Sequence, residues 1–400
     1  YSLARELSRR HEVHIYCRED GFFDQELREV DEVYHGLPVR RIYFNLVGRK
    51  ANPLNQFFIR IKNGLIERSF ERFLEETSPH IVHVQHLFKL SAGLIPLTRK
   101  RGIPVVVTLA DFWYLCHNVL LLRPGQKLCS GPAWGLKCPG CAELNVSPLI
   151  RALLNPLMTP LFIYRNAYLK RCLQQADVVI SPSAFVKKKL VENGYDGHRI
   201  LVSDYGLRTD IRRDFNRLPS DKLRVGYIGT IQRHKGVHIL IEAFNRLKDY
   251  AAELKIYGNP NYAPRYYARV QEMARNPAIQ FYGEVDNADI GRVLANIDVV
   301  VIPSIWYENS PLAIHEANAV KIPVLASNIG GMAELVQDGV TGLLFQVGSA
   351  DDLAAKIRLL VEDRRLLERL RANIRSVKSI EENARELEAI YQELIARRGL

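Results

Sequence analysis

Short apolar runs alternate with longer amphipathic stretches along nearly the whole chain. Continuous apolar runs such as Val299–Ile302 are typical of strands buried on both faces of a parallel sheet. The stretches between them carry the periodicity of helices with one apolar face. The alternation predicts an α/β protein with two parallel sheets covered by helices, its strands at Val13–Cys17, Ile81–Val84, Pro104–Leu109, Asp177–Ile180, Ile200–Val202, Leu223–Ile228, Leu254–Tyr257, Ile279–Phe281, Val299–Ile302, Pro323–Ala326 and Leu343–Phe345.

The length of 400 residues allows two domains with well-developed cores. The polar, charged stretch from Arg208 to Asp221 fits a linker between them. An apolar content of 47% is typical of a globular protein. No uninterrupted apolar stretch approaches the ~20 residues that cross a bilayer, because Arg and Pro interrupt the longest apolar-rich region, Pro148–Tyr168.

Two carboxylates eight positions apart, Glu308 and Glu316, flank the start of the helix that follows the strand Val299–Ile302. Ser310 is placed to cap this helix and Pro311 to occupy its first position. In parallel α/β sheets, ligands bind at the carboxyl ends of strands, where helix N-termini present N–H groups to anions. This segment is therefore the first candidate for a binding site.

Glu316 shares a helical stripe with Leu312 and Val320, so its carboxylate is expected on an apolar face, where it needs a partner. Glu308 lies in the loop before the helix. The alternative interpretation is that Glu308 is a solvated loop residue and that Glu316 belongs to a buried ion pair.

A second strand–loop–helix segment carries positive charge. The loop Gly229–Gly236 follows the strand Leu223–Ile228, and Gly229 allows the backbone to approach a ligand while Arg233 and Lys235 supply cations. The loop is the size of a phosphate site, yet it matches neither the P-loop nor the dinucleotide-binding pattern. A solvated basic helix end is the alternative interpretation.

Positive charge is concentrated in the first half of the chain. Residues 1–220 hold 32 Lys and Arg against 21 Asp and Glu, whereas residues 221–400 hold 23 of each kind. The clusters Arg40–Arg41, Arg99–Arg101 and Lys187–Lys189 suit an anionic membrane surface or a lipid-diphosphate ligand. A solvated basic surface is equally compatible, and nucleic acid is disfavoured because no recognised module accompanies the charge.

Four of the six cysteines gather in a loop rich in Gly and Pro, with the spacing C-x12-C-x8-C-x2-C: Cys116, Cys129, Cys138 and Cys141. A structural zinc ion or an iron–sulfur cluster would organise such a loop, and free or redox-active thiols are the alternative. Cys17 and Cys172 lie in a predicted strand and helix and are expected to pack in the core.

Taken together, the motifs resemble the retaining, nucleotide-sugar-dependent glycosyltransferases of family 4, also described as group 1. The resemblance covers nearly the whole chain and rests on these segments in order: His83–His86, Thr108–Trp113, Ser181–Ser183, Gly229–Gly236, Ile256–Gly258, Tyr282–Gly283, Glu308–Glu316, Pro323–Ser327, Gly330–Glu334 and Asp338–Gly342. It implies the GT-B fold, two Rossmann-like domains whose parallel sheets face a central cleft. The expected division is 1–207 for the acceptor side, with the Cys-rich insertion at about 116–141, 208–379 for the donor side, and 380–400 for a helix that crosses back.

The resemblance also implies roles for individual residues. Catalysis is assigned to Glu308, Lys235 and Arg233, with Glu316 on the ribose hydroxyls and Tyr282 to Val285 beside the base. Donor binding is expected from Gly229, Thr230, Lys235, Gly258, Tyr282, Gly283, Val285, Glu308, Asn309, Ser310, Pro311, Leu312 and Glu316, and the acceptor side from His83, His86 and Asp111.

The implied reaction moves a hexose-type sugar from a nucleoside-diphosphate sugar to a glycan or lipid-linked acceptor, with retention of configuration, in cell-surface polysaccharide or glycolipid synthesis. No cofactor is expected for catalysis, because the D-x-D pair that holds a metal ion in the other major transferase fold does not occur in the chain. The expected location is cytoplasmic, with peripheral contact to the inner face of the cell membrane. A sugar-nucleotide epimerase of the same fold and a catalytically weakened sugar-nucleotide-binding subunit are the alternatives.

The chain departs from the family pattern at several points. Thr230 stands where an Arg often follows the glycine of the phosphate loop, and Ala110 stands where many members carry a His. Tyr205 replaces the more usual Asn before the linker. The family's first strand and its glycine-rich loop are also missing from the sequence, so we expect it to be truncated and its activity in isolation to depend on those elements.

Overall fold

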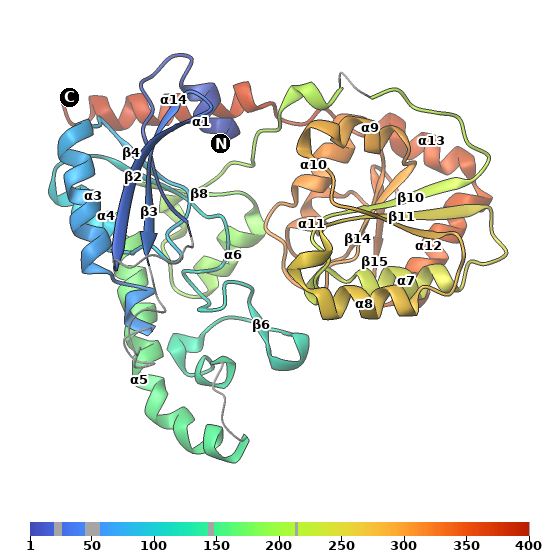
Figure 1. The fold of residues 1–400 in the computed structure, drawn as a ribbon, viewed down its shortest axis with the longest axis horizontal. Helices are drawn as coiled ribbons and strands as arrows, with labels where there is room; N and C mark the ends of the chain where they lie inside the picture. Colours follow the sequence, from blue (N-terminus) through green and yellow to red (C-terminus); the bar gives the residue numbers. More distant parts are fainter. Residues whose placement is uncertain (20–25, 45–56, 143–147, 213–214, 400) are drawn as a thin grey trace.

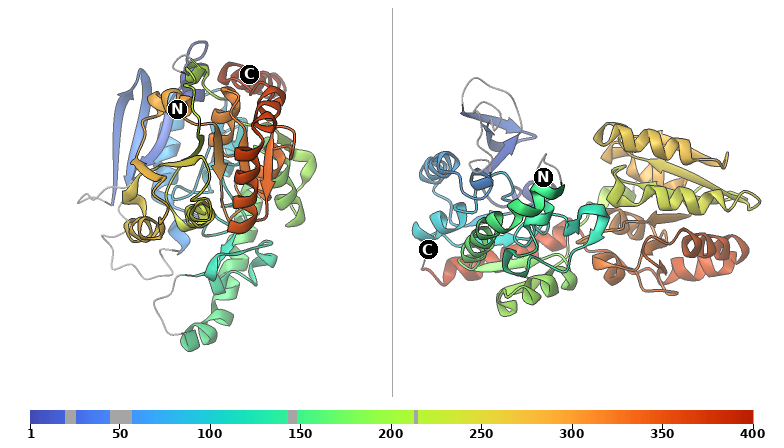
Figure 2. Two further views of the ribbon diagram at one scale, coloured as in Figure 1. Left: turned by 90° about the vertical axis from the view of Figure 1, so that its right-hand side faces the viewer. Right: turned by 90° about the horizontal axis from the view of Figure 1, so that it is seen from below.

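The computed structural model describes residues 1–19, 26–44, 57–142, 148–212 and 215–399. The two halves of the chain form two lobes, each built on its own parallel strands (Figure 1). Figure 2 shows the lobes side by side when the molecule is seen from below. The predicted α/β architecture with two parallel sheets is confirmed, whereas the domain limits at residues 207 and 379 stay predictions.

The second lobe contains a six-stranded sheet with the order β12-β11-β10-β13-β14-β15, and every pairing is parallel. Its strands are β10 Leu223–Ile228, β11 Ala252–Tyr257, β12 Ile279–Gly283, β13 Val299–Ile302, β14 Val324–Ser327 and β15 Gly342–Phe345. The sheet is packed between helices: α7 Val237–Asn245, α8 Pro264–Met273, α9 Ile290–Ala295, α10 Leu312–Ala319, α11 Gly330–Leu335, α12 Ala350–Glu362 and α13 Arg364–Asn373. All four residues of β13 are buried, as the apolar run predicts.

The first lobe contains a four-stranded parallel sheet, β4-β5-β8-β9, and a separate three-stranded sheet, β1-β3-β2. The strands are β1 Ile15–Glu19, β2 Leu27–Tyr34, β3 Leu37–Phe44, β4 Val82–Val84, β5 Val105–Thr108, β8 Val178–Ser181 and β9 Ile200–Val202. The helices are α1 Ser2–Leu7, α3 Gly64–Thr77, α4 Leu94–Lys100, α5 Pro148–Leu173 and α6 Ala184–Glu192.

Two expectations for this lobe were wrong. The first strand lies two residues later than predicted, and the sequence analysis missed the antiparallel pair β2 and β3. These strands were missed because β2 mixes Arg, Asp and Glu with its apolar residues, and only part of each side is covered. A half-exposed strand lacks the continuous apolar run of a central parallel strand.

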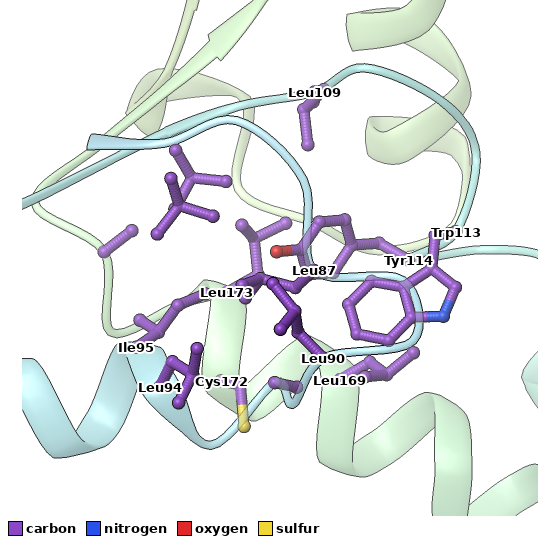
Figure 3. Close-up of a cluster of buried hydrophobic side chains, with 14 of the residues drawn as sticks. Leu87, Leu90, Leu94, Ile95, Leu109, Trp113, Tyr114, Leu169, Cys172 and Leu173 are labelled. Atoms are coloured by element: carbon purple, nitrogen blue, oxygen red, sulfur yellow. The ribbon is translucent and has the colours of Figure 1, made fainter. Parts of the chain in front are cut away.

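The core of the first lobe joins α4, α5 and the segment after β5 (Figure 3). Leu169, Cys172 and Leu173 from the last turns of α5 are buried there against Leu94 and Ile95 of α4. Cys172 is therefore a packing residue, as predicted, and Cys17 is half-buried in β1. Among the described residues, no helix combines the length and the apolar character needed to cross a membrane.

The C-terminal helix α14, Ile380–Ala396, packs against the first lobe rather than the second. Ala384 and Leu387 share an apolar cluster with Val106 and Ile180 of the first sheet. A capping box fixes the start of the helix: Ser379 accepts the N–H of Glu382, and the Glu382 carboxylate accepts the N–H of Ser379.

A half-buried histidine links α14 to the sheet. His83 at β4 bonds the Tyr391 hydroxyl through Nδ1 at 2.5 Å and the Thr108 hydroxyl through Nε2 at 2.8 Å. Burial lowers the pKa of His83 from 6.5 to about 4. The folded protein therefore holds the ring neutral, whereas the unfolded chain binds a proton at higher pH.

We expect the free energy of unfolding to decrease as pH falls from 6.5 towards 4. Over this range His83 takes up a proton in the unfolded chain but stays neutral in the folded protein. Each unit of pKa difference corresponds to about 1.4 kcal/mol at most. Urea unfolding followed at several pH values measures this slope. A His83→Gln variant should lose stability at pH 7.5 but show a shallower decline with acid, and an equally steep decline would contradict the assignment.

Candidate active site

The strand order of the second sheet reverses between β10 and β13, and this switch point, with the loops that follow the two strands, is here called the crevice. From β10 the chain builds β11 and β12 towards one edge, and from β13 it builds β14 and β15 towards the other. Loops that leave the carboxyl ends of two such strands diverge and leave room for a ligand. The two segments singled out in the sequence, Gly229–Gly236 and Glu308–Glu316, follow these two strands.

The loop after β10 closes with a short 3-10 turn, Arg233–Lys235, and then enters α7. Gly236 has φ +74° at this junction, and a Cβ there would lie 1.8 Å from the carbonyl oxygen of Pro303, so only glycine fits. The Ile305 N–H donates to the carbonyl of His234 at 2.9 Å. The basic loop and the loop after β13 are thus held together by their backbones.

Glu308 is nearly buried in the loop after β13, and three donors converge on one of its oxygens. Oε1 accepts from Lys235 Nζ at 2.8 Å, from Ser304 Oγ at 2.7 Å and from Trp306 Nε1 at 2.9 Å. Within the described part of the chain, Oε2 has no hydrogen-bond partner. The carboxylate is fixed in orientation through one oxygen, which leaves the other available to a ligand.

Lys235 is the cation of this arrangement. Its ammonium lies 5.1 Å from the centre of the Trp306 ring as well as beside Glu308. An ammonium group has three donors, of which Glu308 takes one. Burial lowers the pKa of neighbouring His234 to about 4, so the positive charge of the loop at neutral pH comes from Lys235 and exposed Arg233.

Helix α10 starts one residue later than predicted, and the capping role expected for Ser310 was wrong. The helix runs from Leu312 and has Pro311 at its N-cap without a side-chain hydrogen bond. The Ser310 hydroxyl instead donates to Asp204 Oδ1 at 2.6 Å and lies 2.7 Å from His315 Nε2. The Ser310 hydroxyl therefore makes a hydrogen bond between the lobes, and no side chain caps the first turn of α10.

Glu316 lies one turn into α10 and is half-buried. In the described part of the structure its carboxylate has neither an ion-pair nor a hydrogen-bond partner. Partial burial raises the pKa of Glu316 above its ordinary value. The buried ion pair considered from the sequence is thus not formed, and Leu312 on the same stripe is half-exposed instead of covered.

Aromatic residues line the neighbouring strand ends. The rings of Tyr257 and Tyr282 stack at 4.9 Å, and Tyr282 stays 48% exposed. The N–H of Gly229 donates to the carbonyl of Tyr257 at 3.1 Å, and that of Gly258 donates to the carbonyl of Gly283 at 2.7 Å. The predicted donor-site residues Thr230 and Val285 follow the same strand ends, so all of these positions share one edge of the sheet.

Residues of the crevice also contact the first lobe. Asn309 Nδ2 donates to the carbonyl of Ala110 at 2.7 Å, and the Tyr307 ring lies 6.3 Å from that of Phe112. On α11, Glu334 accepts the N–H of Ala184 at the start of α6 at 2.9 Å. The candidate site therefore lies between the lobes, with Ala110 directly at the contact.

The acceptor-side residues predicted in the first lobe separate into two groups. His86 Nε2 and Asp111 Oδ2 are 2.6 Å apart, and Asp111 also accepts the N–H of Trp113, which places this pair next to the Ala110 contact. His83 is committed to Tyr391 and Thr108 through its two ring nitrogens. The geometry gives His83 a role in holding α14.

The four cysteines of the insertion do not form the metal site considered from their spacing. All are free thiols, and among the described residues no group of three or more His, Cys, Asp or Glu side chains could hold a metal ion. Cys116 packs in the main core, and Cys138 packs against Ala142 and Phe162. Burial raises the pKa of Cys138 to about 12, which keeps this thiol protonated. The spacing was misleading because Cys116 and Cys138 are buried as apolar side chains, while Cys129 and Cys141 are half-buried.

Several residues of the site were missed by the sequence analysis. Trp306 and Ser304 both donate to Glu308 from within the same loop. They lie two and four residues before Glu308, and this closeness in sequence could have identified them as its partners. Asp204 and His315 meet Ser310 from opposite lobes. No sequence pattern indicated that contact, because it depends on how the lobes pack.

Comparisons with known proteins agree with this arrangement. The model of "Glycosyltransferase Family 4" matches residues 1–210, and that of "Glycosyl transferases group 1" matches residues 208–377. The capsular polysaccharide biosynthesis glycosyltransferase CapM of Staphylococcus aureus is 26% identical over 249 residues, which cover 54% of this chain and 60% of that protein. Alignments with several other curated relatives span about half of those proteins.

Solved structures share the fold. Sucrose-phosphate synthase from Thermosynechococcus elongatus aligns with a TM-score of 0.69 at 20% identity, over 99% of this chain and 92% of that one. Anabaena Alr3699/HepE in complex with UDP-glucose aligns with a TM-score of 0.56 at 19% identity, over 91% and 86%. With both halves matched and the GT-B arrangement of two lobes in place, the chain belongs to Glycosyltransferase Family 4 and is a glycosyltransferase.

Proposed function

We propose that this glycosyltransferase moves a hexose-type sugar from a nucleoside-diphosphate sugar to a glycan or lipid-linked acceptor in cell-surface polysaccharide or glycolipid synthesis, with retention of configuration. The observation that carries the proposal is the contact of Lys235 Nζ with Glu308 Oε1 at 2.8 Å in the crevice between β10 and β13. UDP-glucose in the Anabaena structure and the capsular role of CapM support the donor and the acceptor class.

The donor phosphates would lie between the basic loop and α10. Lys235 and Arg233 supply cations on one side, and the uncapped N–H groups at the start of α10 face the other. As the leaving diphosphate departs, charge builds on its oxygens, so fixed donors stabilise the transition state. These side chains and amides perform the task for which D-x-D enzymes use a metal ion.

The sugar and the nucleoside would occupy the two flanks of this phosphate site. Glu316, without a partner of its own in the described structure, would accept the ribose hydroxyls, and Tyr282 to Val285 would lie beside the base. Glu308 would present Oε2 to the donor sugar and orient its anomeric carbon.

In the reaction, the bond between the anomeric carbon and the phosphate oxygen breaks while the acceptor oxygen bonds to that carbon. The acceptor proton passes to an oxygen of the leaving diphosphate. Glu308 acts here through position and charge, because three donors on Oε1 weaken its carboxylate as a nucleophile. His86 and Asp111, beside Ala110, would contact the acceptor where other members use the missing His.

The test is incubation with labelled UDP-, GDP- and ADP-sugars and an extract of lipid-linked acceptors. Label on the acceptor supports the proposal. An isomerised donor would instead indicate an epimerase, and donor binding without turnover would indicate a binding subunit. The three incubations differ only in the sugar nucleotide that is added. A thermal-shift screen with UDP, GDP and ADP then shows which nucleotide the protein binds.

Trp306→Phe tests how Glu308 is held. The variant keeps an aromatic ring beside Lys235 but removes the N–H that donates to Glu308 Oε1. We expect kcat/KM to fall roughly 5- to 30-fold, which corresponds to about 1–2 kcal/mol of transition-state stabilisation. The fall should appear in kcat, and the affinity for the nucleotide should be preserved. Unchanged kcat, or a loss confined to donor binding, would contradict this positioning role.

A further inference from the structure

The basic clusters that the sequence singled out are largely neutralised by carboxylates. Arg40 bonds Asp31 and Glu76, and Arg101 bonds Glu71 and Glu75. The other arginines and Lys189 of those clusters also have acidic partners: Arg41 pairs with Glu19 and Glu32, Arg99 with Asp177, and Lys189 with Glu192. Within the described residues, Lys100, Lys187 and Lys188 of these clusters form no ion pair. The membrane role of the clusters stays a prediction, and unpaired positive charge also occurs in a second region.

Unpaired charge occurs around the insertion and α5. Between Phe112 and Ala176 the sequence holds seven Lys and Arg residues and a single acidic one, Glu143. Lys170 lies over the rings of Trp134 and Tyr195 at 5.5 and 5.7 Å. Within the described residues, neither Lys170 nor exposed Arg171 pairs with a carboxylate.

The same region exposes large apolar side chains, here called the apolar ridge: Trp134, Leu136, Leu157, Pro160, Ile163 and Tyr164. Trp134 and Leu157 are the most exposed of these, at 75% and 73%. Leu157, Pro160 and Tyr164 share one face of α5 through their spacing of three and seven residues. An apolar surface next to free cations differs from the scattered exposed leucines of an ordinary surface.

The ridge is a built feature of the fold. The last turns of α5 are anchored in the core of the first lobe, while the rest of the helix reaches past the sheets in both Figure 1 and the left view of Figure 2. The insertion packs onto this helix through Gly135, where a Cβ would lie 2.7 Å from the backbone of Phe162 and Ile163. Backbone contact this close holds Trp134 and Leu136 beside α5.

We propose that the apolar ridge docks on an anionic lipid bilayer, with Lys170 and Arg171 at the headgroups. Indole and phenol rings favour the boundary between headgroups and acyl chains, and long basic side chains reach from such a surface to phosphate. A bilayer fits better than a protein partner, because the ridge carries no acidic residue and is bordered by cations.

The insertion that carries Trp134 and Leu136 follows the segment of the first lobe that contacts the second lobe. In that segment Phe112 contacts Tyr307, and Ala110 bonds Asn309. Docking would hold the mouth of the crevice near the bilayer surface. This consequence rests on the proposed function, since a lipid-linked acceptor presents its sugar at that height, whereas docking itself needs neither donor nor acceptor.

The experiment is sedimentation of the protein with vesicles of phosphatidylcholine alone and of phosphatidylcholine with phosphatidylglycerol. We expect partition onto the anionic vesicles that weakens with salt. Trp134→Ser with Leu157→Ser should reduce the partition constant at least roughly tenfold. Arg171→Glu should reduce it at least roughly fivefold. Leu359→Ser and Arg358→Glu, exposed positions on α12 of the other lobe, are the matched controls and should partition as the wild type does.

Wild-type protein that stays in the supernatant with both vesicles would overturn the proposal, as would ridge variants that sediment like the wild type. A third result would also overturn it: a dimer that the ridge variants convert to monomer, without vesicle binding, would show that a second copy covers this face. Thermal shift with UDP separates the two proposals. Nucleotide binding without vesicle binding refutes docking alone, and the reverse refutes the donor site alone.

Discussion

Replacing Lys235 with Ala is expected to reduce kcat/KM by about 2–4 kcal/mol, roughly 30- to 1,000-fold, which is the loss that accompanies removal of a fixed donor from a developing oxyanion. Lys235 is the cation closest to Glu308 in the crevice, and two of its three donors are not used by that carboxylate. The substitution also leaves Glu308 nearly buried with only Ser304 and Trp306 as donors. Steady-state kinetics with the donor sugar measures the effect.

Two controls separate the phosphate role of Lys235 from its ion pair with Glu308. Lys235→Arg keeps the charge and should retain most of the activity, whereas Lys235→Met keeps the bulk and should be as impaired as Lys235→Ala. The double variant Lys235→Ala with Glu308→Gln removes both charges. If Lys235 served only to neutralise Glu308, the double variant would recover activity, and such recovery would refute the assignment.

The local parts of this site could be predicted because short-range patterns determine them. The predicted strand Val299–Ile302 coincides with β13, because a continuous apolar run is typical of a buried parallel strand. The predicted strand Leu223–Ile228 coincides with β10, although buried Arg224 interrupts its apolar residues. Loops that follow such strands necessarily lie at the carboxyl edge of the sheet. The sequence pattern alone therefore places Lys235 and Glu308 at one edge of the sheet.

The contact between those two residues could not be predicted in the same way. It depends on β10 pairing directly with β13, although β11 and β12 lie between them in the sequence. Strand order is set by how helices cover the whole sheet, and no local pattern encodes it. For the same reason, the sequence analysis assigned Ser310 to a helix cap, whereas packing between the lobes directs its hydroxyl to Asp204.

Polar chemistry in the first lobe was the least predictable part. His83 lies within β4 and His86 lies two residues after it, yet one bonds Tyr391 of α14 and the other pairs with Asp111 at the surface. Only α14, almost three hundred residues later, distinguishes them. The cysteines show the converse error. Their spacing resembles that of metal ligands, yet two of the thiols are buried among apolar side chains, and no group among the described residues could hold a metal ion.

Glu316 is the residue for which the second large effect is expected. Its half-buried carboxylate has no partner in the described structure, so it carries a desolvation cost that a bound ribose would offset. Removing it in Glu316→Ala should weaken nucleoside-diphosphate binding by about 2–4 kcal/mol, since hydrogen bonds to a charged acceptor in a dry site are lost together. The same change should stabilise the empty protein slightly, because the buried charge disappears.

The pH dependence distinguishes a ribose acceptor from a residue that only shapes the crevice. Only the ionised carboxylate accepts from both hydroxyls, and burial raises the pKa of Glu316, so nucleotide affinity should decrease as pH falls through that raised value. Isothermal titration with UDP at several pH values measures it. Glu316→Gln should bind weakly without this pH dependence, and 2′-deoxy-UDP should lose affinity for the wild type but not for Glu316→Ala. If Glu316→Ala lost as much affinity for 2′-deoxy-UDP as for UDP, the ribose would have to bind elsewhere.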